Sequence, residues 1–513
     1  MLSRRSSIAD SAAFAGALVI AFGVLYAILA RVALDAFPYS GDEYSLALQA
    51  ELLAHGQLKA PAPIHAEWLR IDHVVIDQFV RSKYPVGCPA LLSLGARLGA
   101  MWIVNPLIGA VALAVVWWTA RRLLGPRPGL VALVALGAAP LFAIDAASHY
   151  AHISTLLMLA LGFAAVTLWV ESERDGWLVA TGFAIGAAFL IRQLDAVLFG
   201  VALLVFRSRR AVVIPGLVAV PFVVATLWYH DYQFGSPLTD GYRAYEPTFT
   251  ALYGQEAAMN PISWRHIISP TQWWNHLDLI GQLCTQWTLP GTVVVALFGS
   301  YAPLANDRAA IVRRFCFALI AVFLIALVPM IGDLDDGPRP RYLTVVLIPL
   351  AVLCAAGLSS LSRAIVGTFG SRIRTAIVTL GVVFGLAQLG AFLQDRIPKI
   401  WKREGLFEVT ASLPRDAVVI VRAQYPSRFA RNGPFFDGIL YLSTPPTTSA
   451  LEVAAAYPDR PIWEAREGVP WTLQQVHEPG RHSSPGTART VPLSWSWMAH
   501  QVQPRLGTPG EIR

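Results

Sequence analysis

The sequence has few charged residues. Asp, Glu, Lys and Arg make up 14% of its 513 residues, where a soluble domain has about 25%. Hydrophobic residues make up 55%, and the mean hydropathy is +0.51. These values exclude an ordinary soluble domain, and we predict a polytopic membrane protein. The length leaves room for a large helical bundle and an appended extramembrane domain.

The sequence also lacks the patterns of nucleic-acid-binding and metal-binding proteins. The formal net charge of +7 comes mainly from arginines at the ends of apolar runs, without a basic stripe that interleaves aromatics. We therefore expect no nucleic-acid partner. The four cysteines form no Cys-x-x-Cys pair, so their spacing does not predict a metal site. Cys88 and Cys284 fall on the same predicted side of the membrane, and their pairing stays open.

Long apolar runs predict about eleven transmembrane helices, because a bilayer core needs about 20 residues. The first run, 11–34, is too long for the core of a signal peptide, so we expect an uncleaved span. Residues 85–100 are apolar but short and contain two prolines, which favours an interfacial helix. The other ten predicted spans are 104–121, 128–145, 150–170, 176–191, 194–206, 211–230, 287–304, 312–331, 341–360 and 374–395.

Arginine clusters predict the orientation of these spans, because cytoplasmic loops collect arginine. With the N-terminus in the cytoplasm, the arginine-rich loops all lie inside: 121–127, 207–210, 308–314 and 363–374. The first large outer loop is then 35–103 and the second is 230–286. We expect a multi-pass protein of the cytoplasmic (inner) membrane, with its C-terminal part extracytoplasmic.

The C-terminal part has the pattern of a small α/β domain. Runs of β-branched or aromatic residues bounded by Pro, Gly and Asp predict strands, and one helix is expected at 450–456. The strand runs are 416–422, 438–443 and 460–464. Residues 474–513 are poor in such runs, so partial disorder is expected there. The predicted domains are a transmembrane module, 1–395, and an extracytoplasmic domain, 396–513.

Two adjacent acids, Asp42 and Glu43, follow the first span on its outer side. Acids at a membrane boundary are costly and often mark functional sites. One carboxylate could accept a proton from an acceptor hydroxyl, while the other orients it or binds a metal. A solvated turn that only ends the span is the competing interpretation.

Four cations on the outer side are candidates for binding an anion. Lys83 opens the predicted interfacial helix, where its ammonium would bind a phosphate or extend to lipid headgroups. Arg341 opens a span whose N-terminus faces outward, so the helix dipole also favours an anion there. Arg339 could instead pair with a nearby aspartate, and Arg192 with Asp195.

Histidines and tyrosines on the same side are candidates for sugar or acceptor contacts. His149 and His152 share a helical face and could join a carboxylate around a metal, although hydrogen-bonded interfacial histidines are more common. Tyr242, Arg243 and Tyr245 lie in an aromatic loop that could stack on sugars or anchor the chain at the interface. Whether a divalent metal is needed stays open, and no other cofactor is indicated.

Together these motifs resemble the C-type superfamily of integral-membrane glycosyltransferases, in the branch of protein O-mannosyltransferases and lipid A aminoarabinose transferases. The resemblance covers residues 12–360. Val86 replaces the second proline of the usual Pro-Pro-Gly, and His152 stands where many relatives have an acid. The matching motifs are Asp42-Glu43, Lys83-Tyr84-Pro85-Val86-Gly87, Arg341-Tyr342-Leu343 and the Phe-Gly-Ser-Pro-Leu segment at 234–238.

The resemblance implies inverting transfer of a sugar from a polyprenyl-phosphate donor at the outer face of the membrane. Asp42 would be the base, Glu43 would assist it or bind a metal, and Lys83 and Arg341 would hold the donor phosphate. The acceptor would be an envelope glycan such as lipopolysaccharide, a lipid or a protein. The alternative is a transporter or a flippase for lipid-linked sugars, which predicts ionisable residues near the centres of several spans. Here they gather at the outer edges.

Overall fold

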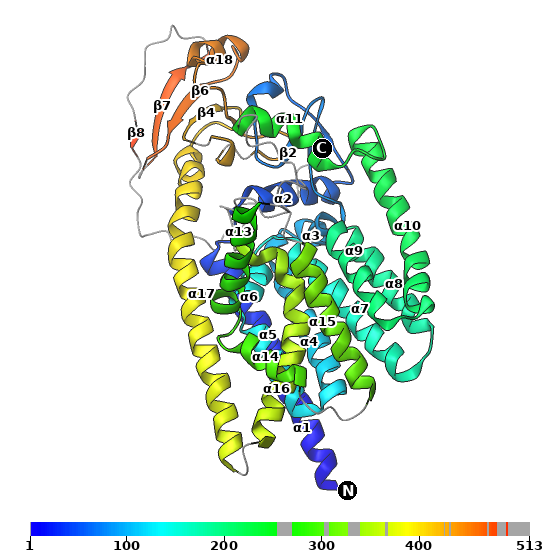
Figure 1. The fold of residues 1–513 in the computed structure, drawn as a ribbon. Helices are drawn as coiled ribbons and strands as arrows, with labels where there is room; N and C mark the ends of the chain where they lie inside the picture. Colours follow the sequence, from blue (N-terminus) through cyan, green and yellow to red (C-terminus); the bar gives the residue numbers. More distant parts are fainter. Residues whose placement is uncertain are drawn as a thin grey trace.

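Long helices form an elongated bundle, and a small sheet domain covers the end of the bundle opposite the N-terminus (Figure 1). In this computed structural model the described residues are 2–253, 269–301, 307–326, 339–364, 368–424, 426–429, 432–468, 471–479 and 489–490.

Seven helical segments in the described part of the chain are long and apolar enough to cross a bilayer. They contain α1 (Leu2–Ile28) with η1 (Leu29–Ala33), η3 (Met101–Ile103) with α4 (Val104–Leu124), α7 (His152–Ser172), α10 (Arg209–Phe234), α15 (Asp307–Ala326), η8 (Arg339–Val346) with α16 (Leu347–Ala364), and α17 (Thr368–Thr410). The pair α5 (Pro126–Gly137) and α6 (Pro140–Ala147), bent by 64°, would make an eighth span.

Three further predicted spans contain shorter apolar helices. They are α8 (Gly176–Phe189), α9 (Gln193–Ala202) with η4 (Leu203–Phe206), and α14 (Thr292–Tyr301). A helix or helix pair therefore lies in each of the eleven apolar runs. By length alone the described residues support seven or eight crossings, so a count of eleven stays a prediction.

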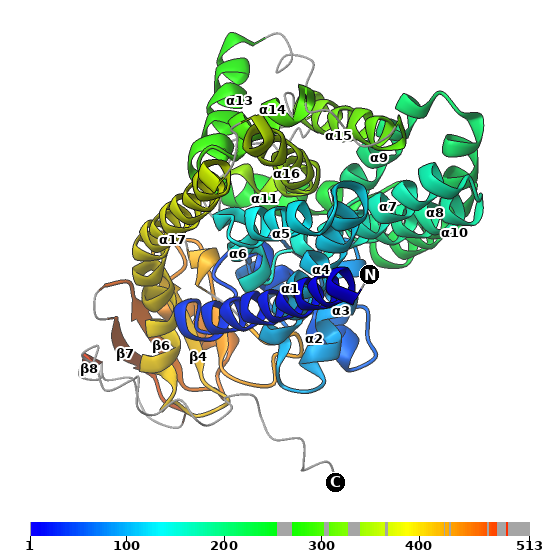
Figure 2. The same cartoon turned by 90° about the horizontal axis from the view of Figure 1, so that it is seen from below.

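Apolar side chains fill the space between these helices. Large rings such as Tyr26, Phe142, Phe163 and Phe315 are fully buried in one continuous core. α16 lies deep in the bundle, with 89% of its apolar window buried, whereas α1 and α17 are peripheral, with 17% each. Seen from below, α7, α8 and α10 lie side by side (Figure 2). The bundle thus has a central helix, α16, whose N-terminal end leads directly to Arg341.

The first large loop, 35–103, folds against the end of this bundle. It contains α2 (Gly41–Ala54), η2 (Ala66–Trp68) and α3 (Gly87–Ala96), together with an antiparallel sheet in the order β1-β3-β2. Its strands are β1 (Ala60–Pro61), β2 (Val74–Ile76) and β3 (Phe79–Ser82). The Gly87 N–H donates to the Leu190 carbonyl at 2.8 Å, and a Cβ at Gly87 would lie 2.6 Å from that oxygen. This close contact seats α3 on the end of α8.

α17 links the bundle to the C-terminal sheet without a break. It continues through residue 395 to Thr410, and its side chains Leu406 and Val409 pack in the core of the sheet. The strand order is β5-β4-β6-β7-β8, with β4 parallel to β5 and β6 and the other pairs antiparallel. The elements are β4 (Val418–Arg422), η9 (Pro426–Arg428), β5 (Leu440–Leu442), α18 (Ala450–Ala456), β6 (Ile462–Arg466), β7 (Thr472–His477) and β8 (Arg489–Thr490).

The strands β4, β5 and β6 lie in or next to the three runs that favour strand, and α18 coincides with the expected helix. β7 and β8 reach into 474–513, where partial disorder was expected. Of that segment, 480–488 and 491–513 lie outside the described residues. The division into domains at 395 stays a prediction.

The sheet domain packs on the first large loop. The Ser443 N–H donates to the Trp68 carbonyl at 2.9 Å, and the Tyr457 hydroxyl donates to the Ile64 carbonyl at 2.7 Å. Leu69 is fully buried among the side chains of β4 and β5. The two parts therefore share a hydrophobic core.

All four cysteines, including Cys88 and Cys284, are free thiols.

Candidate functional site

The site is built around the first turn of α2. Ser40 caps this helix: its Oγ accepts from the Glu43 N–H at 3.2 Å, and Glu43 Oε2 accepts from the Ser40 N–H at 3.1 Å. This reciprocal capping box fixes the start of the helix. Asp42 lies between the two, in the first turn, where the helix dipole favours a negative charge.

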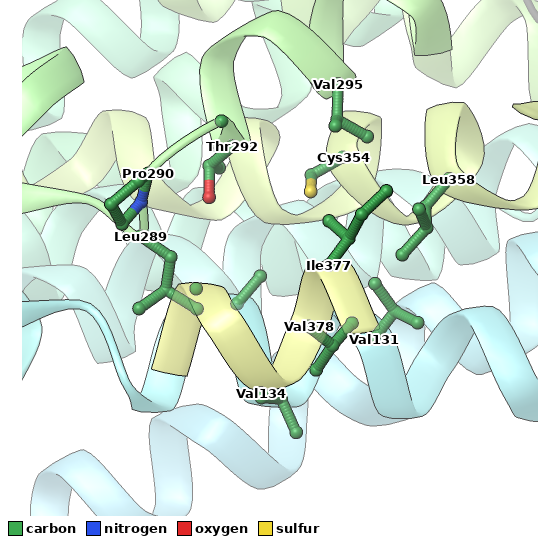
Figure 3. Close-up of a pocket in the computed structure, with 13 residues that line it drawn as sticks. Val131, Val134, Leu289, Pro290, Thr292, Val295, Cys354, Leu358, Ile377 and Val378 are labelled. Atoms are coloured by element: carbon green, nitrogen blue, oxygen red, sulfur yellow. The ribbon is translucent and has the colours of Figure 1, made fainter. Parts of the chain in front are cut away.

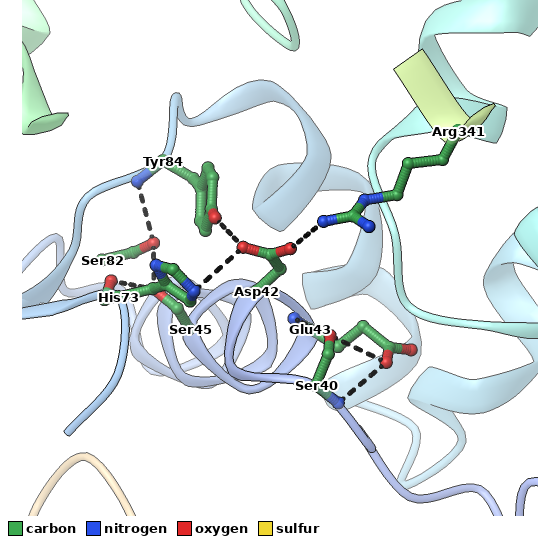
Figure 4. A network of polar contacts seen from close by, with 8 residues as sticks. All are labelled: Ser40, Asp42, Glu43, Ser45, His73, Ser82, Tyr84 and Arg341. Carbon is green, nitrogen blue, oxygen red and sulfur yellow. Dashed lines mark hydrogen bonds and ion pairs between the residues drawn. The ribbon is translucent and has the colours of Figure 1, made fainter. Parts of the chain in front are cut away.

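Glu43 is turned away from Asp42 and holds the backbone (Figure 4). It is fully buried, and besides the cap its Oε1 accepts from the His149 N–H at 2.8 Å. The His149 ring Nδ1 lies 3.8 Å from the same oxygen. Glu43 thus connects α2 to the turn before α7, and the backbone N–H of His149 makes this connection.

Asp42 is the centre of a polar network. Its Oδ1 accepts from the Tyr84 hydroxyl and lies 3.3 Å from His73 Nε2, while its Oδ2 accepts from Arg341 Nη2 at 3.0 Å (Figure 4). Burial alone would raise the pKa of the Asp42 carboxyl, but His73, Arg341 and Lys83, with the Tyr84 hydrogen bond, hold it well below its usual range. Asp42 is therefore ionised at neutral pH.

Gly41 lets the start of the hairpin formed by β2 and β3 approach α2. A Cβ at this position would lie 2.8 Å from side-chain atoms of both Asp72 and His73, closer than carbon atoms pack. His73 also has a positive φ of 63°, which is costly outside glycine and common at functional sites. The glycine and the unusual backbone together place the imidazole on Asp42.

Lys83 is enclosed by aromatic rings. Its side chain is 2% exposed, and Nζ lies 4.7 Å, 5.0 Å and 5.2 Å from the ring centres of Tyr242, Tyr245 and Tyr84. Burial lowers the pKa of the ammonium to about 8, although Asp42 and Asp72 favour its charged form. The cation is thus stabilised by ring faces and nearby carboxylates.

Helix α11 (Gly241–Tyr253) brings two of these rings to Lys83. A Cβ at Gly241 would lie 1.9 Å from the Lys83 carbonyl oxygen, so the helix starts directly against the backbone of Lys83, just after β3. Arg243, on the same helix, is exposed, and its backbone N–H donates to Asp240 at 2.9 Å. The structure therefore places Tyr242 and Tyr245 beside Lys83.

A second group of cations lies on the Arg341 side of Asp42. The Arg341 guanidinium is 5.3 Å from the Tyr342 ring centre, and the Arg192 guanidinium is 5.1 Å from the same ring. Arg192 also donates to Asp195 at 2.7 Å, which is the pairing that the sequence left open. His152 packs edge-on against Tyr342 at 5.7 Å. This group joins the turn before α9, the start of α7 and the start of η8.

Two buried side chains in this region have polar atoms without a partner among the described residues. His152 is 5% exposed and Arg341 is 4% exposed. Among the described residues, neither ring nitrogen of His152 nor Arg341 Nη1 has a hydrogen-bond partner. Buried polar groups usually have a hydrogen-bond partner, so these atoms are available to a ligand.

The described residues do not form a metal-ligand set. Among them, no three His, Cys, Asp or Glu side chains gather in a way that could hold a metal ion. Asp42 is paired with a guanidinium, and His149 faces Glu43. Arg339 begins η8, but its side chain lies outside the described part of the chain.

An apolar pocket lies within the bundle, between α5, the start of α14, α16 and α17 (Figure 3). Its walls are aliphatic except for the Thr292 hydroxyl and the Cys354 thiol. The lining residues are Val131, Val134, Ala135, Leu289, Pro290, Gly291, Thr292, Val295, Cys354, Leu358, Ile377, Val378 and Gly381.

Known proteins resemble this chain in part of its sequence and in its fold. Residues 85–229 match the family model described as dolichyl-phosphate-mannose-protein mannosyltransferase. The crystal structure of ArnT from Cupriavidus metallidurans bound to undecaprenyl phosphate matches with a TM-score of 0.55 at 15% identity, over 87% of this chain and 92% of that chain. The apo form of ArnT has a TM-score of 0.54, with the same identity and coverage.

The oligosaccharyltransferase AglB from Archaeoglobus fulgidus, solved with an inhibitory peptide and a dolichol-phosphate, has a TM-score of 0.46 at 12% identity, over 83% of this chain and 64% of that chain. Among curated proteins, no sequence matches.

Proposed function

Since the chain has the fold of the C-type superfamily of integral-membrane glycosyltransferases, we propose that it transfers a sugar from a polyprenyl-phosphate donor to an acceptor in the cell envelope. The reaction takes place at the outer face of the cytoplasmic membrane, where the donor arrives already attached to its lipid. The acceptor is a glycan, a lipid or a protein. The likeness to ArnT, which was solved with undecaprenyl phosphate, supports this class of donor.

One contact carries the proposal: Arg341 Nη2 donates to Asp42 Oδ2 at 3.0 Å. The two residues are 299 positions apart in the sequence, and folding brings a carboxylate base and a phosphate-binding cation together. Displacement of a phosphate by a hydroxyl needs both groups, one on each side of the reacting carbon.

The mechanism follows from this arrangement. The acceptor hydroxyl passes its proton to Asp42 as its oxygen bonds to the anomeric carbon, and the bond from that carbon to the phosphate oxygen breaks. Arg341 and Lys83 stabilise the charge on the departing lipid phosphate. Attack from the side opposite the phosphate inverts the anomeric centre.

Donor binding would also change the basicity of Asp42. Arg341 has a second nitrogen, Nη1, without a partner among the described residues, and this nitrogen can bind a phosphate oxygen. A phosphate that shares the guanidinium weakens its hold on Asp42, so the pKa of the carboxyl rises. The base thus becomes stronger when the donor is in place.

The remaining residues have supporting roles in this proposal. His152 and Arg192 would contact the donor sugar or phosphate, and Tyr242 and Tyr245 would face the sugar beside Lys83. Glu43 would hold the first turn of α2, and with it Asp42, in place. The apolar pocket in Figure 3 offers hydrocarbon-like walls to part of a prenyl chain.

Envelope glycans of living cells test the proposal and identify both substrates. Cells without the gene should lack one sugar in one glycan, seen by mass spectrometry, and wild-type protein should restore it. Asp42→Asn should fail to restore it. The matched control is Asp395→Asn, which removes an exposed acid of α17 paired with Lys399, and it should restore the sugar fully. A complete glycan with Asp42→Asn would contradict the role of Asp42.

A further inference from the structure

Asp145 is a buried acid that the proposed reaction does not use. It lies near the end of α6, is 0% exposed, and has Oδ2 2.6 Å from Thr344 Oγ1. Within the described chain, Oδ1 has no hydrogen-bond partner. The charged groups that act on it are Arg341, Arg192 and Glu43, whose ion pairs and hydrogen bonds go to other residues. An ionised carboxylate in such surroundings is costly.

Thr344 connects Asp145 to Arg341. Its Oγ1 lies 2.6 Å from Asp145 Oδ2 and also 2.6 Å from the backbone oxygen of Arg341. A hydroxyl has one hydrogen, and a carbonyl oxygen can only accept. If Thr344 donates to the carbonyl, the hydrogen between Thr344 and Asp145 must belong to the carboxyl group.

We propose that Asp145 is a neutral, hydrogen-bond-donating residue that positions Arg341 through Thr344. The Asp145 O–H donates to Thr344 Oγ1, and the Thr344 O–H donates to the Arg341 carbonyl. These two bonds hold the first turn of η8 against α6, so the guanidinium keeps its place 3.0 Å from Asp42. The inference rests on the proposed role of Arg341 in holding the donor phosphate.

Paired variants of the full-length protein test each bond. Asp145→Asn keeps a neutral donor, so its affinity for undecaprenyl phosphate should stay within about threefold of wild type, while Asp145→Leu should lose about tenfold, the effect of roughly one hydrogen bond. Thr344→Ser keeps the hydroxyl and should also bind undecaprenyl phosphate within about threefold of wild type, whereas Thr344→Val should lose about tenfold in affinity. The double variant Asp145→Leu/Thr344→Val should bind no more weakly than either single variant, because both break the same chain of bonds.

Two results would overturn the inference. Equal weakening by Asp145→Asn and Asp145→Leu would mean that a negative charge, rather than a neutral donor, is required. Additive losses in the double variant would mean that the two residues act separately. If the wild type binds no undecaprenyl phosphate, the proposed function fails. The midpoints of thermal unfolding then still test whether Asp145 is a neutral hydrogen-bond donor. The Asn and Ser variants should then unfold near the wild-type midpoint, and the Leu and Val variants below it.

Discussion

At the scale of single residues, Lys83 should give the site its pH dependence. Its pKa is lowered to about 8 by burial, so the ammonium loses its proton as the pH rises through this value. The KM for the lipid-linked donor should therefore rise several-fold between about pH 7 and about pH 9. Lys83→Arg keeps its charge throughout and should remove the dependence. The same rise in the arginine variant would show that another group titrates.

Glu43 should act on stability, because its carboxylate joins buried backbone groups. Glu43→Ala leaves the buried N–H groups of Ser40 and His149 without their acceptor and should cost about 2 kcal/mol or more. Glu452 is a matched control, since it closes an exposed capping box with Ser449 at the start of α18. Glu452→Ala should cost about 1 kcal/mol or less. Unfolding midpoints in detergent compare the two, and equal losses would contradict the buried role.

Residue type and sidedness were enough to select the pair Asp42 and Glu43, but only the family resemblance preferred Asp42 as the base. The same reasoning selected Lys83 and Arg341, and the structure brings both close to Asp42. The same reasoning missed His73 and did not assign a role to Tyr84. Both reach Asp42 because the hairpin of β2 and β3, which His73 precedes and Tyr84 follows, folds back over Gly41. Hydropathy carries no information on such a contact. The signals that pointed to them were the Lys-Tyr-Pro motif for Tyr84 and an Asp-His pair in the same loop for His73.

At the scale of elements, the contact between α11 and Lys83 depends on Gly241. A Cβ there meets the Lys83 carbonyl oxygen at 1.9 Å, so Gly241→Ala must push the helix away from the lysine. We expect transfer to fall at least about tenfold while the protein stays folded. Gly216→Ala, in α10, is the control because nothing lies within 4 Å of its Cβ. It should leave activity unchanged, and equal activity of the two variants would contradict the proposed role of α11.

Helices of the bundle could be predicted from the sequence because their apolar runs are long and continuous. The bend between α5 and α6 was not foreseen, although Pro140 at the start of α6 is a residue that ends a preceding helix. The first large loop was also missed in detail. Its strands have two to four residues, and they depend on contacts with α2 and the sheet domain rather than on a local pattern.

At the scale of the whole molecule, the first large loop and the sheet domain should unfold together. Leu69 is fully buried in the core that they share, so Leu69→Ala should cost about 2–5 kcal/mol and expose both parts to limited proteolysis. Leu451→Ala on α18 is the control because its side chain is 66% exposed, and it should have little effect. Cleavage confined to one of the two parts would contradict a shared core.

The resemblance to the C-type superfamily is confirmed by the family match and the fold shared with ArnT. It could be recognised from the sequence because four short motifs keep their order and their predicted side of the membrane, although each motif alone is weak. The association of α17 and the sheet domain with the first large loop could not be predicted from the sequence, since it depends on surfaces that meet only after folding.

Transfer by the purified protein tests the central claim most directly. The protein is mixed with the lipid-linked sugars and the envelope acceptor of its own cells, and the product is followed by mass spectrometry. Wild-type protein and Asp395→Asn should move one sugar to the acceptor with inversion at the anomeric carbon. Asp42→Asn should be slower by at least about a hundredfold, as expected for loss of a general base. Full transfer by Asp42→Asn, or movement of the donor across a bilayer without a new glycosidic bond, would contradict the account.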